Sequence, residues 1–143
     1  MNRIRVALER AYENALYSAE LPAGHVAFRI GEAPKGPAPK DALAIITAWD
    51  PVTARRADEV NREANARLGE ALQASGWMSH PAKACAPDGT HEEPSFAVPG
   101  MDPDSALALA RTFGQAAVFC WDGARARLLW CEDLSLSASG GPP

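Results

Sequence analysis

The chain has 143 residues, of which 47% are hydrophobic and 22% are charged, so it is long enough to bury a core and has an ordinary globular composition. Its net charge of −4 and its pI near 5.3 argue against a nucleic-acid-binding surface, which is usually basic. No apolar run approaches the roughly 20 residues of a membrane helix, and no signal-peptide core follows Met1. With three cysteines that lack close spacing, these features predict a cytoplasmic protein without a membrane segment.

The N-terminal third contains one predicted helix and two predicted strands. Apolar residues at helical spacing predict a helix over residues 3–17, and alternating residues predict a strand over His25–Ile30. Residues 31–40 are rich in proline and glycine and predict a loop. An apolar strand then runs from Leu43 to Trp49, and Asp50-Pro51 ends it because proline cannot donate a hydrogen bond to a sheet.

The middle of the chain predicts a long helix and two further strands. The helix begins between Thr53 and Asp58, either of which can cap it, and it runs to Ser75 before Gly76. Residues 77–92 predict a weak strand followed by a loop, and residues 95–98 predict a short strand.

The last third predicts a helix and a hairpin. Asp102-Pro103 is a strong helix start, with aspartate as the N-cap and proline at the first helical position, and Gly114 marks the end. Strands over 116–121 and 125–131 form a hairpin around the turn dipeptide Asp122-Gly123. The final residues, 135–143, predict a disordered tail.

The predicted hairpin has a definite register. A two-residue turn at Asp122-Gly123 places Cys120 opposite Arg125. Cys131 then lies roughly 20 Å away along the strand, so a disulfide between Cys120 and Cys131 is excluded. One face of the hairpin belongs to the core, and the other is at least partly in contact with water.

The order of these elements predicts the fold class. From Leu43 onward it is strand, helix, strand, strand, helix, strand, strand, and without the last strand this is the ferredoxin-like split βαβ arrangement. We therefore predict an α+β fold with a ferredoxin-like split βαβ core, an added N-terminal helix and strand, and a C-terminal hairpin. Residues 1–134 form a single domain in this prediction.

Polar residues gather where the predicted apolar segments end. Thr47, Trp49 and Asp50 close one strand, and Gln115 begins the strand expected to run antiparallel beside it. Asn61 lies roughly 50° from the centre of the apolar arc of its helix, so its amide needs buried partners. It either holds the Asp50-Pro51 turn or forms the wall of a pocket.

Glu93 and Ser95 share one face of their strand. A buried glutamate needs a cation, and Arg29 at the end of the first strand is the predicted partner, within about 4 Å. In the predicted topology Glu93 lies at the sheet end opposite Thr47, so the two residues need not form one site.

No cofactor or metal site is predicted. His80, Cys85 and His91 match no zinc spacing, and Gly31 and Gly36 lack the Lys-Ser/Thr that a phosphate-binding loop requires.

Several short motifs, in this order and spacing, resemble the bacterial family called domain of unknown function 3293, over about residues 10 to 130. They are Arg29-Ile30-Gly31, Ile46-Thr47-Ala48-Trp49-Asp50-Pro51, Asn61 with Leu68 and Leu72, Gly76, Glu93-x-Ser95-Phe96 and Phe113-Gly114-Gln115-Ala116-Ala117-Val118-Phe119. The resemblance implies a small bacterial protein and no particular activity or cofactor. The family usually has asparagine where this chain has Asp50, which removes an amide donor and adds charge.

These observations leave three functional hypotheses. The first is a non-enzymatic domain that binds a small polar ligand or a protein partner through the residues Thr47, Trp49, Asp50, Asn61, Glu93, Ser95 and Gln115. The second is an enzyme that uses Glu93 or Asp50 as an acid/base group. The third is a homodimeric interaction module with an exposed sheet edge and a tryptophan-rich hairpin.

Overall fold

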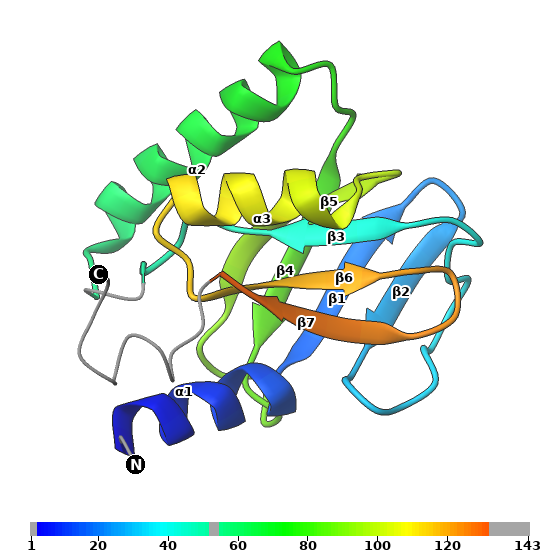
Figure 1. Ribbon diagram of the computed structural model, residues 1–143, viewed down its shortest axis with the longest axis horizontal. Coiled ribbons are helices and arrows are strands. Elements are labelled where there is room, and N and C mark those ends of the chain that lie inside the picture. The colour runs from blue at the N-terminus through cyan, green and yellow to red at the C-terminus, as the bar shows by residue number, and fades with distance from the viewer. Residues whose placement is uncertain (1–2, 52–54, 132–143) are drawn as a thin grey trace, which may run out of the picture.

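The protein has an α+β fold, built from one seven-stranded antiparallel sheet and three helices (Figure 1). The computed structural model describes residues 3–51 and 55–131. The strand order is β2-β1-β4-β5-β3-β6-β7. The elements are α1 (Arg3–Asn14), β1 (Leu16–Leu21), β2 (Gly24–Phe28), β3 (Leu43–Ile46), α2 (Asp58–Ala74), β4 (His80–Cys85), β5 (Glu93–Pro99), α3 (Pro103–Thr112), β6 (Ala117–Trp121) and β7 (Ala126–Trp130).

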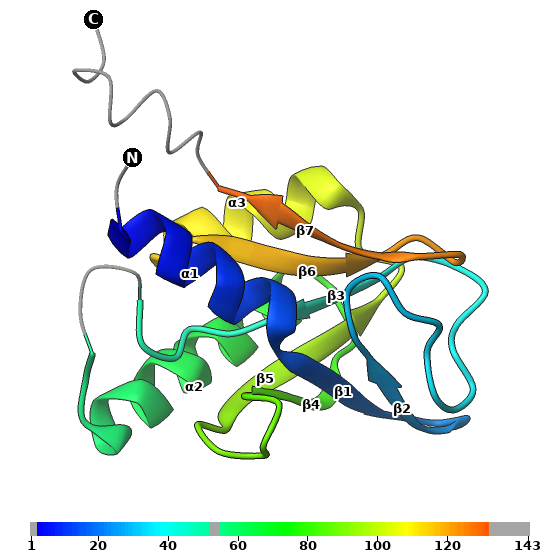
Figure 2. The ribbon, with the colours of Figure 1, turned by 90° about the horizontal axis from the view of Figure 1, so that it is seen from below.

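The two faces of the sheet have separate cores. Helices α2 and α3 lie together on one face, and residues such as Ile46, Leu68 and Val98 pack between them and the sheet. The strongly twisted sheet encloses a second core on its other face, which we call the inner face, where Phe28, Phe119 and other aromatic side chains meet. Helix α1 lies apart from α2 and α3, on the inner-face side (Figure 2).

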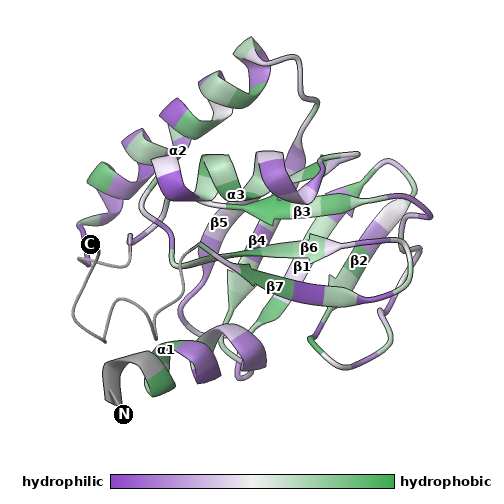
Figure 3. Cartoon of the chain, viewed as in Figure 1, coloured by the Kyte–Doolittle hydropathy of each residue, from purple (hydrophilic) through white to green (hydrophobic). Residues whose placement is uncertain are grey.

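The central strands are buried because both of their faces are covered. Every residue of β3 and of β6 is buried, and both strands are coloured largely as hydrophobic in Figure 3. This pattern is a continuous apolar run rather than a strict alternation, as expected for strands covered on both sides.

The N-terminal segment differs from the sequence-based expectation. The first helix ends at Asn14 rather than at residue 17, and Leu16–Leu21 forms β1 between β2 and β4. The segment therefore contains a hairpin where one strand was predicted. Pairing on both sides buries Ser18 as well as its apolar neighbours, and these tertiary contacts outweigh the local helical pattern.

Helix α2 begins within the predicted range and buries most of the predicted face, but its N-cap differs from the prediction. It begins at Asp58 after Ala57, which makes no side-chain cap, so Asp58 is not the N-cap; Thr53 lies outside the described residues. Val60 follows the apolar spacing of this helix but is 42% exposed. The buried face is formed by Asn61, Ala64, Asn65, Leu68 and Leu72.

The C-terminal elements lie where the pattern predicts them, with one correction of register. Helix α3 is capped by Asp102, which accepts a hydrogen bond from the Ser105 backbone N–H at 3.0 Å. In the hairpin, Cys120 pairs with Arg127 rather than with Arg125. The Asp122 side chain accepts hydrogen bonds from the two N–H groups of residues 124 and 125, and this widens the loop to four residues.

The shift of two residues keeps each side chain of the hairpin on its predicted face. Cys120, Cys131 and Cys85 are free thiols, as the distance argument for the first two requires. The second face is drier than expected, because α3 buries Cys120, although Arg127 remains exposed.

Three other strands differ from the prediction: β4 is a regular strand, β5 begins at Glu93 rather than at Ser95, and β3 ends at Ile46 rather than at Trp49. The predicted disordered tail, 135–143, lies outside the described residues. Within the described part of the chain, no helix is long and apolar enough to cross a membrane.

Candidate functional site

A partly open cavity of about 1010 Å³ lies between α1 and the inner face of the sheet. Strands β1, β3, β4, β5 and β6 all contribute to its lining. The lining is mainly apolar, and its polar side chains come from the segments that enter or leave these strands. This cavity is the candidate site because ligand sites are typically concave and mostly apolar, with a few polar groups.

Strand alternation explains why the predicted polar residues converge here. Thr47 follows β3 and has the same parity as Ile45, whose side chain lies on the inner face. Strand β5 runs antiparallel to β3, so its start at Glu93 and Ser95 lies beside the end of β3. The Thr47 Oγ1 donates a hydrogen bond to the Pro94 carbonyl at 2.7 Å. The prediction that Glu93 and Thr47 lie at opposite ends of the sheet is therefore wrong.

Gln115 lies on the same end of the sheet. It is buried, and its Nε2 donates to the Trp49 carbonyl at 3.2 Å. This confirms the prediction that Gln115 sits beside the end of the Leu43–Trp49 segment. The turn at Gly114 brings it there, because its backbone has a φ of 73° and the Gln115 N–H bonds to the Ala110 carbonyl.

Asn65, which sequence reasoning missed, holds the strand ends together. Its Oδ1 accepts from the Ala48 N–H at 2.7 Å, and its Nδ2 donates to the Pro94 carbonyl at 2.9 Å. It lies four residues after Asn61, so the helical spacing of two asparagines was a signal that could have identified it. One side chain of α2 thus links β3 and β5 behind the cavity.

Asn61 fixes the conformation of Asp50. It is fully buried, its Oδ1 accepts from the Asp50 N–H, and its Nδ2 donates to Asp50 Oδ1, both at 2.9 Å. The Arg56 N–H also donates to Asp50 Oδ1, at 2.8 Å. This confirms the prediction that Asn61 is buried and bonded to the segment after β3. Because Asn61 does not line the cavity, it holds the turn at Asp50 and does not form a pocket wall.

Asp50 has a strained backbone and an ionised side chain. Its φ is 39°, a left-handed conformation that aspartate tolerates better than most residues. Burial alone would raise its pKa, but the hydrogen bonds from Arg56 and Asn61 and the positive charges of Arg55 and Arg56 lower the pKa below its usual value. Asp50 therefore keeps a carboxylate at the cavity at neutral pH.

Glu93 has the opposite electrostatics. Burial and the nearby negative charge of Asp50 raise its pKa to about 7, and the positive charge of Arg55 offsets only part of this effect. Its carboxyl has neither a hydrogen bond nor an ion-pair partner among the described side chains, which are those of residues 6–51 and 55–131. The predicted pairing with Arg29 is wrong, because β1 and β4 lie between β2 and β5 in the sheet.

Aromatic side chains line the cavity beside Glu93. Tyr17 stacks on Phe119 with ring centroids 4.7 Å apart, and its hydroxyl donates to the Tyr12 carbonyl at 2.8 Å. Tyr12 in turn packs edge-on against Trp130, at 5.4 Å. Burial, together with the charge of Glu93, raises the pKa of Tyr12 to about 12, so its hydroxyl stays protonated.

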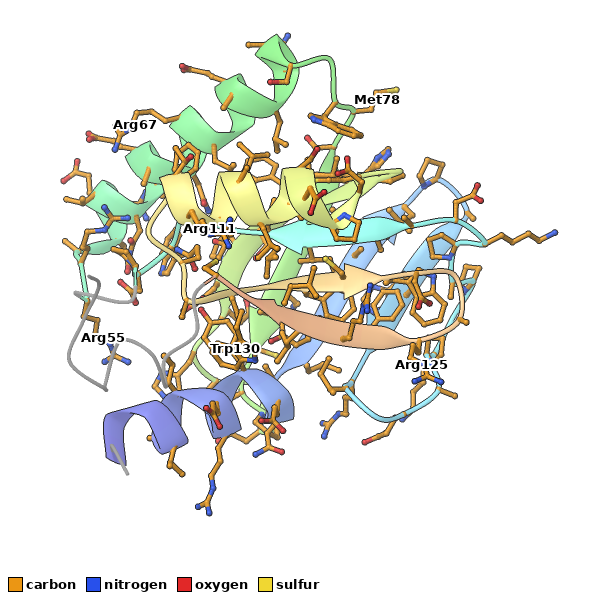
Figure 4. The ribbon with its side chains drawn as sticks, in the orientation of Figure 1. Arg55, Arg67, Met78, Arg111, Arg125 and Trp130 are labelled. Atoms are coloured by element: carbon orange, nitrogen blue, oxygen red, sulfur yellow. The ribbon has the colours of Figure 1, made fainter. Side chains whose placement is uncertain are left out.

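Positive charge lies at the mouth of the cavity rather than inside it. Arg10 of α1 and Arg55, ahead of α2, are both exposed lining residues. Figure 4 shows Arg55 beyond the start of α2, on the side toward α1. His91 also lines the cavity and has a φ of 56°; it and Asp50 are the non-glycine residues with positive φ in the described chain. Backbone strain of this kind concentrates at functional sites.

The structure brings together five of the seven predicted site residues at this cavity: Thr47, Asp50, Glu93, Ser95 and Gln115. The other two, Trp49 and Asn61, lie next to the site and contact it through hydrogen bonds. Sequence reasoning missed the contributions of α1 and β1, because residues 16–21 were not recognised as a strand. No group of three or more His, Cys, Asp or Glu side chains in the described ranges is placed to hold a metal ion.

Comparison with known families identifies the chain. The family model described as protein of unknown function DUF3293 matches residues 46–118, about half of the sequence. The chain belongs to the DUF3293 family. No curated protein and no solved structure is significantly similar to it. Membership confirms the resemblance seen in the motifs, over a shorter range than residues 10–130, and assigns no activity.

The DUF3293 segment contains only part of the cavity. All seven predicted site residues fall within residues 46–118, and so does the asparagine pair of α2. Tyr12 and Tyr17 lie before the matched segment, and Phe119 follows it. The family segment thus supplies most of the polar groups of the cavity, and flanking elements supply much of its aromatic wall.

Proposed function

We propose that this DUF3293 protein binds a small molecule in the cavity between α1 and the sheet. The observation that carries the proposal is Glu93, a carboxyl that faces this cavity without an ion-pair partner in the described chain. A structural glutamate at such a place would be expected to have a cation beside it. A glutamate that binds a ligand would instead leave its carboxyl without a cation from the protein.

The walls support a ligand with both apolar and polar parts. Tyr17, Ala117 and Phe119 offer an apolar surface for a flat or aliphatic body. Thr47, Ser95 and Gln115 add polar groups to the same lining, together with the two carboxyl groups. Cavities that bind small molecules generally combine a large apolar area with a few convergent polar groups.

A second candidate function is catalysis with Glu93 as general acid or base. A pKa of about 7 gives comparable amounts of the acid and the base at neutral pH, which is the condition for efficient proton transfer. Asp50 is less suited to that role, because its lowered pKa keeps it ionised. In this scheme Asp50 would stabilise the protonated form of Glu93 through its charge.

The third hypothesis, a protein-interaction module built on the tryptophan hairpin, has less support. Trp121 is buried in the inner core, and its indole N–H donates to the Pro39 carbonyl at 2.8 Å. Trp130 packs against Tyr12. Among the described residues the large hydrophobic side chains that are exposed are Val60 and Met78, and Met78 points away from the hairpin in Figure 4.

Filling the cavity tests the proposed function. Ala84 lines the cavity, whereas Lys83, its neighbour on β4, projects from the opposite face of the strand and is exposed. We expect hits from a small-molecule screen, scored by thermal shift and by NMR, to be lost in Ala84→Trp and retained in Lys83→Trp. Hits that survive Ala84→Trp would place the binding site elsewhere and contradict the proposal.

We further propose that the core is a ferredoxin-like split βαβ unit. The support is the order β4-β5-β3-β6, with α2 connecting β3 to β4 and α3 connecting β5 to β6. In this view α1, the β1–β2 hairpin and β7 are additions that extend the sheet and enclose the cavity.

A further inference from the structure

We propose that the ligand of this cavity carries a protonated amine, held jointly by Glu93 and Asp50, on an apolar body that lies against the aromatic wall. The inference rests on the proposed function and goes further by naming the chemical class of the ligand. It rests on the distribution of charge along the cavity. The two carboxyl groups are partly buried in the lining, whereas the two arginines are exposed.

The two carboxyl groups of the cavity are less exposed than its two arginines. Glu93 and Asp50 both line the cavity, and each is only partly exposed. They are close enough for the charge of Asp50 to act on Glu93. Hydrogen bonds from the described residues reach Asp50 at Oδ1 only, from Arg56 and Asn61. Two carboxyl groups that repel each other are stabilised when a further cation enters the cavity between them.

The cations of the protein do not fill this role. Arg10 and Arg55 line the cavity but are exposed at its mouth, where solvent and salt screen their charge. Neither forms an ion pair with Glu93 among the described residues. The charge of a ligand ammonium inside the cavity is screened less by solvent, so its attraction to the same two carboxyl groups is stronger.

The wall next to Glu93 also suits an organic cation. Tyr12 and Tyr17 lie near enough to Glu93 for its charge to raise the pKa of each hydroxyl, and both line the cavity. Aromatic faces attract ammonium groups, and the same rings bind the adjacent carbon chain. A hydrated metal ion would use neither property.

Three probes of one shape separate the possibilities. 2-Phenylethylamine, 2-phenylethanol and 3-phenylpropionate share a phenyl ring and a two-carbon spacer and differ in charge. We expect the amine to bind about tenfold more tightly than the alcohol at pH 8, as judged by NMR titration, because a charge-assisted contact replaces a neutral one. The acid should bind most weakly.

The pH dependence gives an independent readout. As the pH rises from 6 to 8 through the pKa of Glu93, about 7, its carboxyl becomes ionised while the amine stays protonated, so amine affinity should rise by up to about tenfold. The titratable and charged groups that share the cavity with Glu93 are Arg10, Tyr12, Tyr17, Asp50, Arg55, Cys85 and His91.

Two matched variants test whether Glu93 or His91 causes the preference for the amine and its pH dependence. Glu93→Gln should fold well, because the raised pKa means that the fold favours a neutral side chain there, and it should lose both the preference for the amine and the pH dependence. His91→Asn should retain both, since asparagine also tolerates the φ of 56° at this position.

The outcomes are distinguishable. If the alcohol or the acid binds the cavity as tightly as the amine, the amine proposal is overturned and the proposed function stands. Tighter binding of the acid that is lost in Arg55→Gln would show that the mouth, not the interior, selects the ligand. If no probe of any charge shifts the NMR signals of cavity residues, at concentrations up to their solubility, both proposals fail.

Discussion

At the scale of single residues, Glu93 makes stability depend on pH. Its pKa is about 7 in the folded protein, against an unperturbed value near 4.3, so the folded state binds more protons between these values. Its contribution is therefore greatest below the unfolded pKa and is lost as the pH rises through the folded pKa. We expect the free energy of unfolding to fall by roughly 1 to 3 kcal/mol from pH 4.5 to pH 8 on account of this group.

The adjacent Glu92 provides the control for this prediction. It is exposed and pairs only with Lys83, at 3.3 Å, so Glu92→Gln should leave the pH dependence in place. Glu93→Gln should remove it, in urea denaturation followed at a series of pH values. A profile that Glu93→Gln does not alter would mean that Glu93 titrates normally, and the acid/base candidate would lose its basis.

At the scale of elements, the junction after α3 depends on Gly114. Its φ is 73°, and an added Cβ would lie 2.9 Å from the Cβ of Pro51. Gly76, which follows α2, has a similar φ of 83° but open space around it. Gly76→Ala should therefore cost about 1 kcal/mol for the backbone conformation alone, and Gly114→Ala should cost more, roughly 2 to 3 kcal/mol, as measured by chemical denaturation. Equal costs would show that Pro51 moves aside freely.

Which elements could be predicted follows from where their stability arises. Helix α3 was predictable because its signals are local: the Asp102 cap and the stop at Gly114 lie within the segment itself. Strand β1 was not, because the helical spacing of the preceding segment continues as far as Leu16, and Leu16–Leu21 forms a strand by pairing with β2 and β4. The error over Glu93 has the same origin, since its neighbours depend on strand order and not on its own segment.

At the scale of the whole molecule, the cavity joins the DUF3293 segment to the elements that flank it. Residues 46–118 contribute both carboxyl groups and the amide of Gln115, and α1 lies over them. Among its described side chains, residues 6–14, α1 contributes nothing to either hydrophobic core. The helix therefore encloses the cavity more than it supports the sheet.

The last prediction separates these two roles of α1. A chain that lacks residues 1–13 should still unfold cooperatively, with a melting temperature lower by several degrees, because it loses the Tyr12–Trp130 contact but keeps both cores. The cavity should open, and the pKa of Glu93, measured by NMR titration of the carboxyl carbon, should fall toward its ordinary value because burial is the main cause of its shift. Fluorescence of Trp130 should report the lost contact with Tyr12. A truncated chain that melts without cooperativity would show instead that α1 is part of the folding core, and a Glu93 pKa still near 7 would show that the sheet alone buries this carboxyl.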